Sequence, residues 1–166
     1  MKIKFELNGH HIEIDENPRK KLSEFLRQEN YFSVKAGCGN GNCTSCTVLI
    51  NDVPMLSCLI PLAKVIDSKI TTLDHFMKSD DYEDIEQAFK EQGINLCGYC
   101  NSGKIFTTYE LIKNIPIIKK NEFRDKIIEH ISFFTCNCVE RDNLIIGIFL
   151  AAKKRAARLG AKKNEK

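Results

Sequence analysis

The sequence predicts an α+β fold made of two domains, residues 1–76 and residues 80–159, with a basic tail over residues 160–166. In the first part, apolar and polar residues alternate, as they do in strands with one buried face. From Asp80 onward, apolar residues recur three and four positions apart, which is the spacing of one helix face. The eight cysteines divide into two groups of four, one in each part. We therefore expect a sheet-containing domain followed by a helical one, each organised around four cysteines.

The first domain begins with a predicted β-hairpin and a helix. Polar and apolar residues alternate over Lys2–Leu7 and again over His11–Ile14. Between these segments, Asn8–Gly9 is a two-residue sequence typical of a tight hairpin turn. In Asn17–Pro18, the asparagine is a suitable N-cap and the proline a suitable first helical residue. The pattern after them predicts an amphipathic helix over residues 18–29.

Two more strands complete the first domain. The segment Thr47–Ile50 is a predicted strand, and Asn51–Asp52 is a predicted turn after it. Cys58 lies on a short return segment, and Lys69–Leu73 is the predicted last strand. Two strands followed by a helix and a cysteine-containing loop favour a β-grasp arrangement, in which a sheet curls over one helix.

The loop before the third strand holds three cysteines, and a fourth follows after it. The four are separated by four, two and eleven residues, which is the plant-type ferredoxin spacing of thiolates that hold a [2Fe-2S] cluster. Gly37, Gly39 and Gly41 let the backbone approach a compact anion and take positive φ angles. A structural zinc ion is the alternative, although zinc ligands usually come as two short paired motifs. The candidate ligands are Cys38, Cys43, Cys46 and Cys58.

The second domain is predicted to contain four helices. Their starts and ends are marked by possible N-caps, by Gly93 and by Pro116. The predicted helices run from Asp80 to near Gly93, from Asn101 or Ser102 to Pro116, over Glu122–Ile131 and over Asp142–Leu159.

Each cysteine pair of the second domain lies just before a predicted helix. Helix N-termini present unpaired N–H groups and the positive end of the helix dipole, which suits an anionic cluster. Taken alone, C-x2-C is also compatible with zinc or with dithiol redox chemistry, and C-x-C is a weaker pattern still. The candidate ligands in this domain are Cys97, Cys100, Cys136 and Cys138.

Composition and charge narrow the class of protein. The sequence shows no secretory signal, and its longest apolar run, Leu144–Ala152, is too short to span a bilayer, so we expect a cytoplasmic protein without membrane association. Eight cysteines in such a chain favour metal binding over disulfides. Residues 153–166 hold seven basic residues and one acidic residue, a net charge of +6. Because no aromatic residue is interleaved with them, we expect a solvated helix end and no nucleic-acid partner.

The combination of C-x4-C-x2-C-x11-C with C-x2-C and C-x-C resembles the small iron–sulfur subunit of the xanthine dehydrogenase family, the molybdenum hydroxylases. The resemblance extends to about Leu159. It implies a ferredoxin-like β-grasp domain and a four-helix-bundle domain that hold one [2Fe-2S] cluster each. The implied ligands are Cys38, Cys43, Cys46 and Cys58 for the first cluster and Cys97, Cys100, Cys136 and Cys138 for the second.

The resemblance also implies a function and partners. Electrons would leave the molybdopterin site of a large subunit, cross the helical-domain cluster and then the ferredoxin-like cluster, and pass to an FAD-binding subunit or another acceptor. The chain would thus be the electron-transfer subunit of an oxidoreductase complex, with substrate chemistry on a partner. No nucleophile–base pair or phosphate-binding loop indicates a catalytic residue within the chain itself.

Four departures from the family pattern concern the surroundings of the cysteines. Thr44 stands where glycine is usual, and Leu96 replaces a glutamine that contacts the pterin in the family. Asn101–Lys104 replaces Thr-Pro-Gly-Met, and Val139–Arg141 replaces Thr-Gly-Tyr. The changes at Leu96 and Val139–Arg141 favour an alternative function, a two-cluster ferredoxin-like carrier or redox-sensing module that serves a different oxidoreductase. The complete set of eight cysteines favours the molybdenum hydroxylase subunit.

Overall fold

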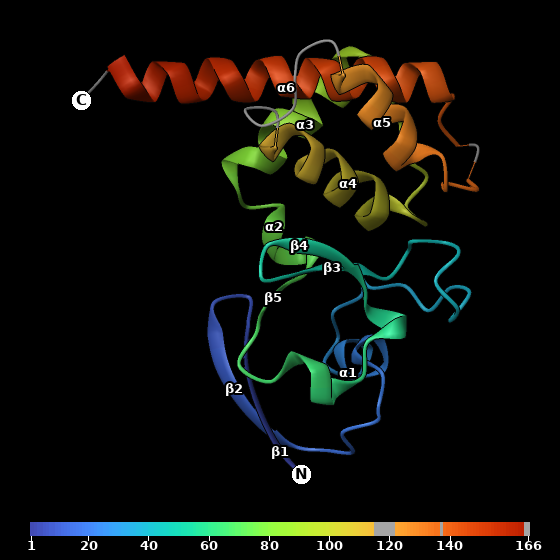
Figure 1. Cartoon of the computed structure of the whole chain (residues 1–166), viewed down its shortest axis with the longest axis vertical. Coiled ribbons are helices and arrows are strands. Elements are labelled where there is room, and N and C mark those ends of the chain that lie inside the picture. The colour runs from blue at the N-terminus through green and yellow to red at the C-terminus, as the bar shows by residue number, and fades with distance from the viewer. Residues whose placement is uncertain (115–121, 137, 165–166) are drawn as a thin grey trace.

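The computed structural model describes residues 1–114, 122–136 and 138–164 (Figure 1). A mixed sheet forms the N-terminal half, and helices stack on the β3–β4 side of that sheet to form the other half (Figure 1). Each half has its own cluster of buried apolar side chains. None of the helices in the described part of the chain combines the length and apolar character that a bilayer crossing requires.

The sheet has five strands in the order β2-β1-β5-β3-β4. Strands β1 and β5 are parallel, and the other neighbouring pairs are antiparallel. The short helix α1, Leu22–Gln28, packs its buried residues against the alternate inward residues of β1. This arrangement confirms the predicted sheet over one helix. The strands are β1 Lys2–Leu7, β2 His10–Asp15, β3 Thr47–Ile50, β4 Val53–Leu56 and β5 Lys69–Thr71.

The predicted start of the first helix at Pro18 is wrong, because α1 begins at Leu22. Asn17 forms a turn instead of a helix N-cap: its Oδ1 accepts the Arg19 N–H at 3.0 Å. The carbonyl of Asn17 also accepts the N–H of Lys20 at 3.0 Å. Four residues therefore remain extended or turned before the helix begins.

Four short elements of the sheet half were not predicted, a strand, a helix and two 3₁₀ turns. The return segment after Asn51–Asp52 pairs with β3 as the edge strand β4, where Pro54 needs no N–H for a further neighbour. The strand predicted over Lys69–Leu73 ends at Thr71, since Leu73 begins the four-residue helix α2, Leu73–Phe76. Cys58 lies in a 3₁₀ turn, η1 Ser57–Leu59, and a second such turn, η2, covers Leu62–Val65.

The helical half consists of α3 Asp80–Glu91, α4 Asn101–Lys113, α5 Phe123–Ile131 and α6 Arg141–Asn164. These bounds confirm the four predicted helices, although α6 continues five residues beyond Leu159. The N-cap of α4 is Cys100 and not Asn101 or Ser102. The Asn101 side chain instead accepts the N–H of Gly98 at 3.0 Å. The predicted break at Pro116 lies outside the described residues.

Candidate metal centres

The first four cysteines converge on one side of the sheet domain. Cys38, Cys43, Cys46 and Cys58 all line a single cavity of about 140 Å³, although Cys58 comes from the turn η1 and the others from the loop before β3. Cys46 and Cys58 are buried, and Cys38 is exposed. The cavity therefore presents four sulfur atoms from two separate segments, as a cluster ligand set requires.

Backbone N–H groups surround the sulfur of Cys38. The N–H groups of Asn42 and Cys43 lie 3.1 Å and 3.3 Å from Cys38 Sγ, and the N–H of Cys38 lies 3.3 Å from Cys43 Sγ. Donors from the Asn40 and Cys43 backbone lower the pKa of Cys38 to about 6. Such N–H groups stabilise a thiolate and, equally, an anionic cluster bound to it.

At Cys58, in the turn η1, burial shifts the thiol pKa in the opposite direction. Desolvation, followed by the neighbouring thiol of Cys46, raises the pKa of Cys58 to about 11. A buried thiol of this kind is not a free nucleophile, and a bound metal removes its proton outright. The ligand set therefore runs from the exposed Cys38 to the buried Cys46 and Cys58.

The backbone of this loop depends on conformations that glycine favours. Gly41 has a φ of 91°, and a Cβ at Gly37 would lie 2.5 Å from Cys43 Sγ and from Ser45 Oγ. Thr44 also has a positive φ of 56°. Thr44, which stands where the family usually has glycine, therefore adopts a left-handed backbone that costs a residue with a Cβ about 1–2 kcal/mol.

The second four cysteines meet between the start of α4 and the start of α6. The Sγ atoms of Cys97, Cys136 and Cys138 all lie within 4.8 Å of one another. Cys100 is buried at the N-cap of α4. Burial is the main cause that raises the pKa of Cys100, and the nearby thiol of Cys136 raises it further. The structure thus brings together both pairs, which are separated by more than thirty residues in the sequence.

The thiols of this second site are also differentiated by their surroundings. The backbone N–H of Cys138 lowers the pKa of Cys136 to about 7. Burial raises the pKa of Cys138, as it does that of Cys100. As in the first site, N–H donors and burial act on different members of one ligand set, and the donor set fits an anionic iron–sulfur cluster.

Lys104 is a residue of this site that sequence reasoning noted only as a departure from the family pattern. Its side chain is 1% exposed, and its Nζ lies 2.9 Å from Cys100 Sγ. Burial lowers the pKa of Lys104, but the sulfurs of Cys100, Cys138 and Cys136 act more strongly together, and the pKa is raised. The available signal in the sequence was a lysine four residues after a candidate ligand, on a helix whose other central residues are mostly apolar.

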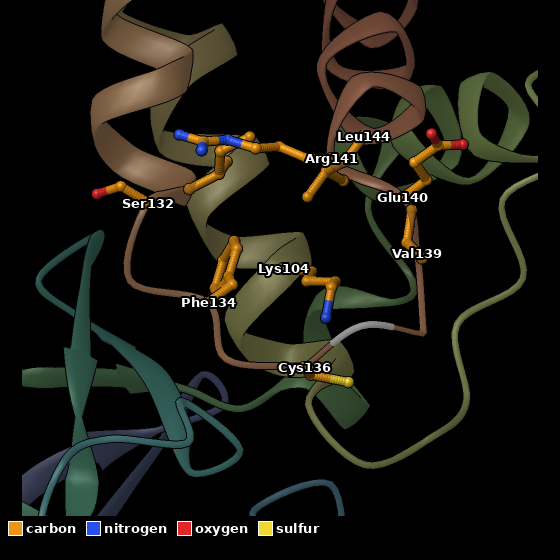
Figure 2. A pocket seen from close by; sticks show the side chains of 9 residues that line it. Lys104, Ser132, Phe134, Cys136, Val139, Glu140, Arg141 and Leu144 are labelled. Atoms are coloured by element: carbon orange, nitrogen blue, oxygen red, sulfur yellow. The ribbon is translucent and has the colours of Figure 1, made fainter.

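A cavity of about 550 Å³ adjoins the second site (Figure 2). Val139, Glu140 and Arg141, which differ from the family pattern, line it together with Lys104 and Cys136. Leu96 does not line this cavity but packs against the helical core. Val139–Arg141 therefore lie at the cavity, whereas Leu96 lies at the core.

Comparison with protein families gives a match for each half of the chain. Residues 5–63 match the model of a "2Fe-2S iron-sulfur cluster binding domain", and residues 72–148 match that of a "[2Fe-2S] binding domain". These matches confirm the cofactor predicted for each half and leave the zinc alternative without support.

The chain is also similar to curated proteins and to a solved structure over most of its length. One of the nicotinate dehydrogenase subunits from Pseudomonas putida is 31% identical over 92% of this chain and 96% of its own length. The xanthine dehydrogenase iron-sulfur-binding subunit of Escherichia coli O157:H7 is 34% identical over 66% and 69%. The crystal structure of quinoline 2-oxidoreductase from Pseudomonas putida 86 matches with a TM-score of 0.78 and 29% identity, over 96% of this chain and 97% of that one.

Proposed function

Because the chain belongs to the small iron–sulfur subunits of the xanthine dehydrogenase family, the molybdenum hydroxylases, we propose which of its residues serve each cluster. The cavity between the cysteine loop and η1 holds one [2Fe-2S] cluster, and the site between α4 and α6 holds the other. The division of the chain follows these sites, with domains at 1–76 and 80–159. The proposed ligands are Cys38, Cys43, Cys46 and Cys58 for the first, and Cys97, Cys100, Cys136 and Cys138 for the second.

The chain is an electron-transfer subunit of an oxidoreductase complex, and substrate chemistry takes place on a partner subunit. When bound, a [2Fe-2S] cluster takes up and releases a single electron. The residues of this chain hold the clusters, shield them and place them relative to each other. The observation that carries the assignment of the ligands is the convergence of both four-cysteine sets, each from segments distant in sequence.

The chain's own residues also connect the two sites. The Oγ of Ser102 donates a hydrogen bond of 3.0 Å to the carbonyl of Ser45. Ser45 lies between Cys43 and Cys46, and Ser102 lies two residues after Cys100. This bond is buried, so it fixes the cysteine loop of one half directly on the first turn of α4 in the other.

We propose that the helical half faces a large molybdopterin-binding partner and that the sheet half passes electrons to an FAD-binding subunit or another acceptor. The named relatives act on nicotinate and xanthine, and the solved structure is a quinoline oxidoreductase. An aromatic nitrogen heterocycle is accordingly the proposed substrate class of the complex. A cytoplasmic location would keep the eight thiols reduced and available for cluster assembly.

Purification of the tagged full chain from its native cells tests this proposal against a carrier that serves a different oxidoreductase. We expect a large subunit containing molybdopterin and a flavoprotein to copurify in fixed stoichiometry with the chain. The complex should reduce a dye when supplied with its substrate. Copurification with an oxidoreductase that lacks molybdenum would contradict the proposed partners and support the alternative.

A further inference from the structure

Lys104 is a buried cation, and the eight cysteines do not need it in order to hold the two clusters. Its side chain is 1% exposed although it lines the cavity beside the second site, so its ammonium group is largely removed from bulk water. A cation in an apolar interior is unfavourable unless an anion accompanies it. Among the residues that the structure describes, no carboxylate forms an ion pair with Lys104.

The groups that do contact this ammonium belong to the second cysteine site. Nζ lies 2.9 Å from Cys100 Sγ and 5.3 Å from the centre of the Phe134 ring. Lys104 lies one helical turn after Cys100, so the two side chains share a face of the helix. In Figure 2, the amine of Lys104 points toward the end of the cavity where Cys136 lies.

We propose that the Lys104 ammonium is a built-in counter-charge for the cluster of the helical domain and raises its reduction potential. This inference rests on the proposed function, since it requires a cluster at the four cysteines. Reduction adds a negative charge to a centre that is already anionic, so a fixed positive charge stabilises the reduced form more than the oxidised form. The low dielectric of the core strengthens this effect, and a hydrogen bond to a ligand sulfur acts in the same direction.

The first site has no matching buried cation among the described residues. Around Cys38 the donors are backbone N–H groups, and the nearby amine of Lys21 is directed to the carbonyl of Gly39 at 3.1 Å. Lys21 is also exposed, so water screens its charge. The effect of Lys104 should therefore fall on one cluster, which leaves the other as an internal reference. A raised potential would favour entry of an electron into the helical domain.

The test is a redox titration of the full chain with both clusters, followed by electron paramagnetic resonance (EPR). Three variants are compared with the original chain. Lys104→Met keeps the length of the side chain and removes the charge, and Lys104→Arg keeps the charge. Lys113→Met removes a lysine nine residues further along α4, roughly 13 Å away by helical rise, and controls for net charge.

In Lys104→Met we expect the ratio of reduced to oxidised helical-domain cluster, at a fixed potential, to fall at least tenfold. That change corresponds to a shift of about 59 mV for a one-electron couple. The ferredoxin-like cluster should change by less than threefold. Lys104→Arg and Lys113→Met should each stay within threefold of the original chain for both clusters.

If the reduction potential of the helical-domain cluster were unchanged in Lys104→Met, the proposed role of Lys104 would be wrong, while the cluster assignment would stand. Absence of the iron–sulfur signals from the original chain would instead contradict the proposed function. If Lys104→Met does not retain the second cluster, a second measurement is made on the original chain. Pulsed EPR with side-chain ¹⁵N-labelled lysine then tests whether the Lys104 nitrogen lies next to the helical-domain cluster. We expect a ¹⁵N coupling on the helical-domain signal that Lys104→Arg removes. Its absence from the original chain would overturn the inference.

Discussion

Single residues give the two cysteine sites different electrostatic surroundings. In the first site, backbone N–H groups of Asn42 and Cys43 contact the exposed sulfur of Cys38. In the second, the buried ammonium of Lys104 contacts the buried sulfur of Cys100. Backbone donors and a full positive charge stabilise an anionic centre to different extents. The two clusters should consequently have distinct potentials and distinct paramagnetic signals.

Replacing Cys136 with serine tests the ligand set of the second site. A serine hydroxyl is a much poorer iron ligand than a thiolate, so we expect the helical-domain signal to be lost or strongly altered. The other signal should remain, with roughly half of the iron and sulfide. Iron analysis and EPR of the reduced protein measure both effects.

Cys58→Ser is the matched control, because it should affect only the ferredoxin-like signal. Together the two variants assign each signal to its site. If Cys136→Ser changed neither signal, the proposed ligands of the helical domain would be wrong.

At the scale of elements, the long helix α6 is held against α3 by charge pairs. The solvated end expected for residues 153–166 is wrong for its first part, since Arg155 and Arg158 are mostly buried against acidic side chains of α3. Much of the positive charge near the C-terminus is therefore neutralised within the fold. The pairs are Lys154–Glu91 at 2.5 Å, Arg155–Asp81 at 2.9 Å, Arg158–Asp84 at 2.8 Å, Arg158–Asp80 at 3.3 Å, Lys162–Asp80 at 2.6 Å and a close pair between Arg158 and Asp81.

Asp84→Asn should destabilise the helical domain by about 1–3 kcal/mol, because it removes the charge of the most buried of the three carboxylates that pair with Arg158. Unfolding in urea at pH 7, monitored by the helical signal in circular dichroism, measures this difference. Glu86→Gln on the same helix is the control: its pair with Lys90 is exposed and should change stability by less than about 0.5 kcal/mol. Equal effects of the two substitutions would show that burial of the Arg158 pair contributes nothing.

The stabilising contribution of the Asp80–Lys162 pair, at the start of α3, should depend on pH in a predictable direction. The hydrogen bond from Lys162 holds the pKa of Asp80 below its ordinary value. A lowered carboxyl pKa in the folded state means that its stabilising contribution is present at neutral pH and is lost as the pH falls through the folded pKa. Because both side chains are exposed, this contribution is small and is screened by salt.

The elements with a clear repeating pattern were predictable, and the short ones were not. Alternation gave the first hairpin, and helical spacing gave α3 to α6. The four-residue elements β4 and α2 are too short to show a period. The start of α1 was misplaced because Asn17–Pro18 suits a turn as well as a helix start.

Both sets of candidate cluster ligands could be predicted, because the spacing of the cysteines can be read directly from the sequence. The contact between Lys104 and Cys100, and the pairing of α6 with α3, depend on how side chains pack in three dimensions. A lysine within a helix reads as exposed unless its surroundings are known, because lysine is rarely buried. Only the structure could therefore assign Lys104 to the site.

In the whole molecule, the two halves meet where the cysteine loop of the sheet half lies against the first turn of α4. Thr44 and Ser45 of the cysteine loop lie against Ser102 and Gly103 in the first turn of α4. At the other end of α4, the Tyr109 hydroxyl donates a 2.8 Å hydrogen bond to Asp52 in the β3–β4 turn. Helix α4 therefore both carries a proposed ligand, Cys100, and docks the helical half on the sheet.

Gly103→Ala tests this contact. A Cβ at Gly103 would lie 2.6 Å from the Cβ of Thr44 and 2.9 Å from its carbonyl oxygen, so the halves would have to separate slightly. We expect a loss of about 1–3 kcal/mol in the free energy of unfolding, measured by denaturant titration of the cluster-containing protein.

Gly160→Ala is the control, because nothing lies within 4 Å of its added Cβ and alanine favours the helix. It should leave stability unchanged or raise it by up to about 1 kcal/mol. A Gly103→Ala protein as stable as the Gly160→Ala protein would mean that the halves do not pack as described.

Iron and sulfide analysis of the anaerobically purified full chain, combined with EPR after reduction, tests the assignment of the eight cysteines most directly. Two clusters require about four iron and four sulfide per chain and two distinguishable [2Fe-2S] signals. A colourless protein with bound zinc, or a single signal with about two iron per chain, would contradict it.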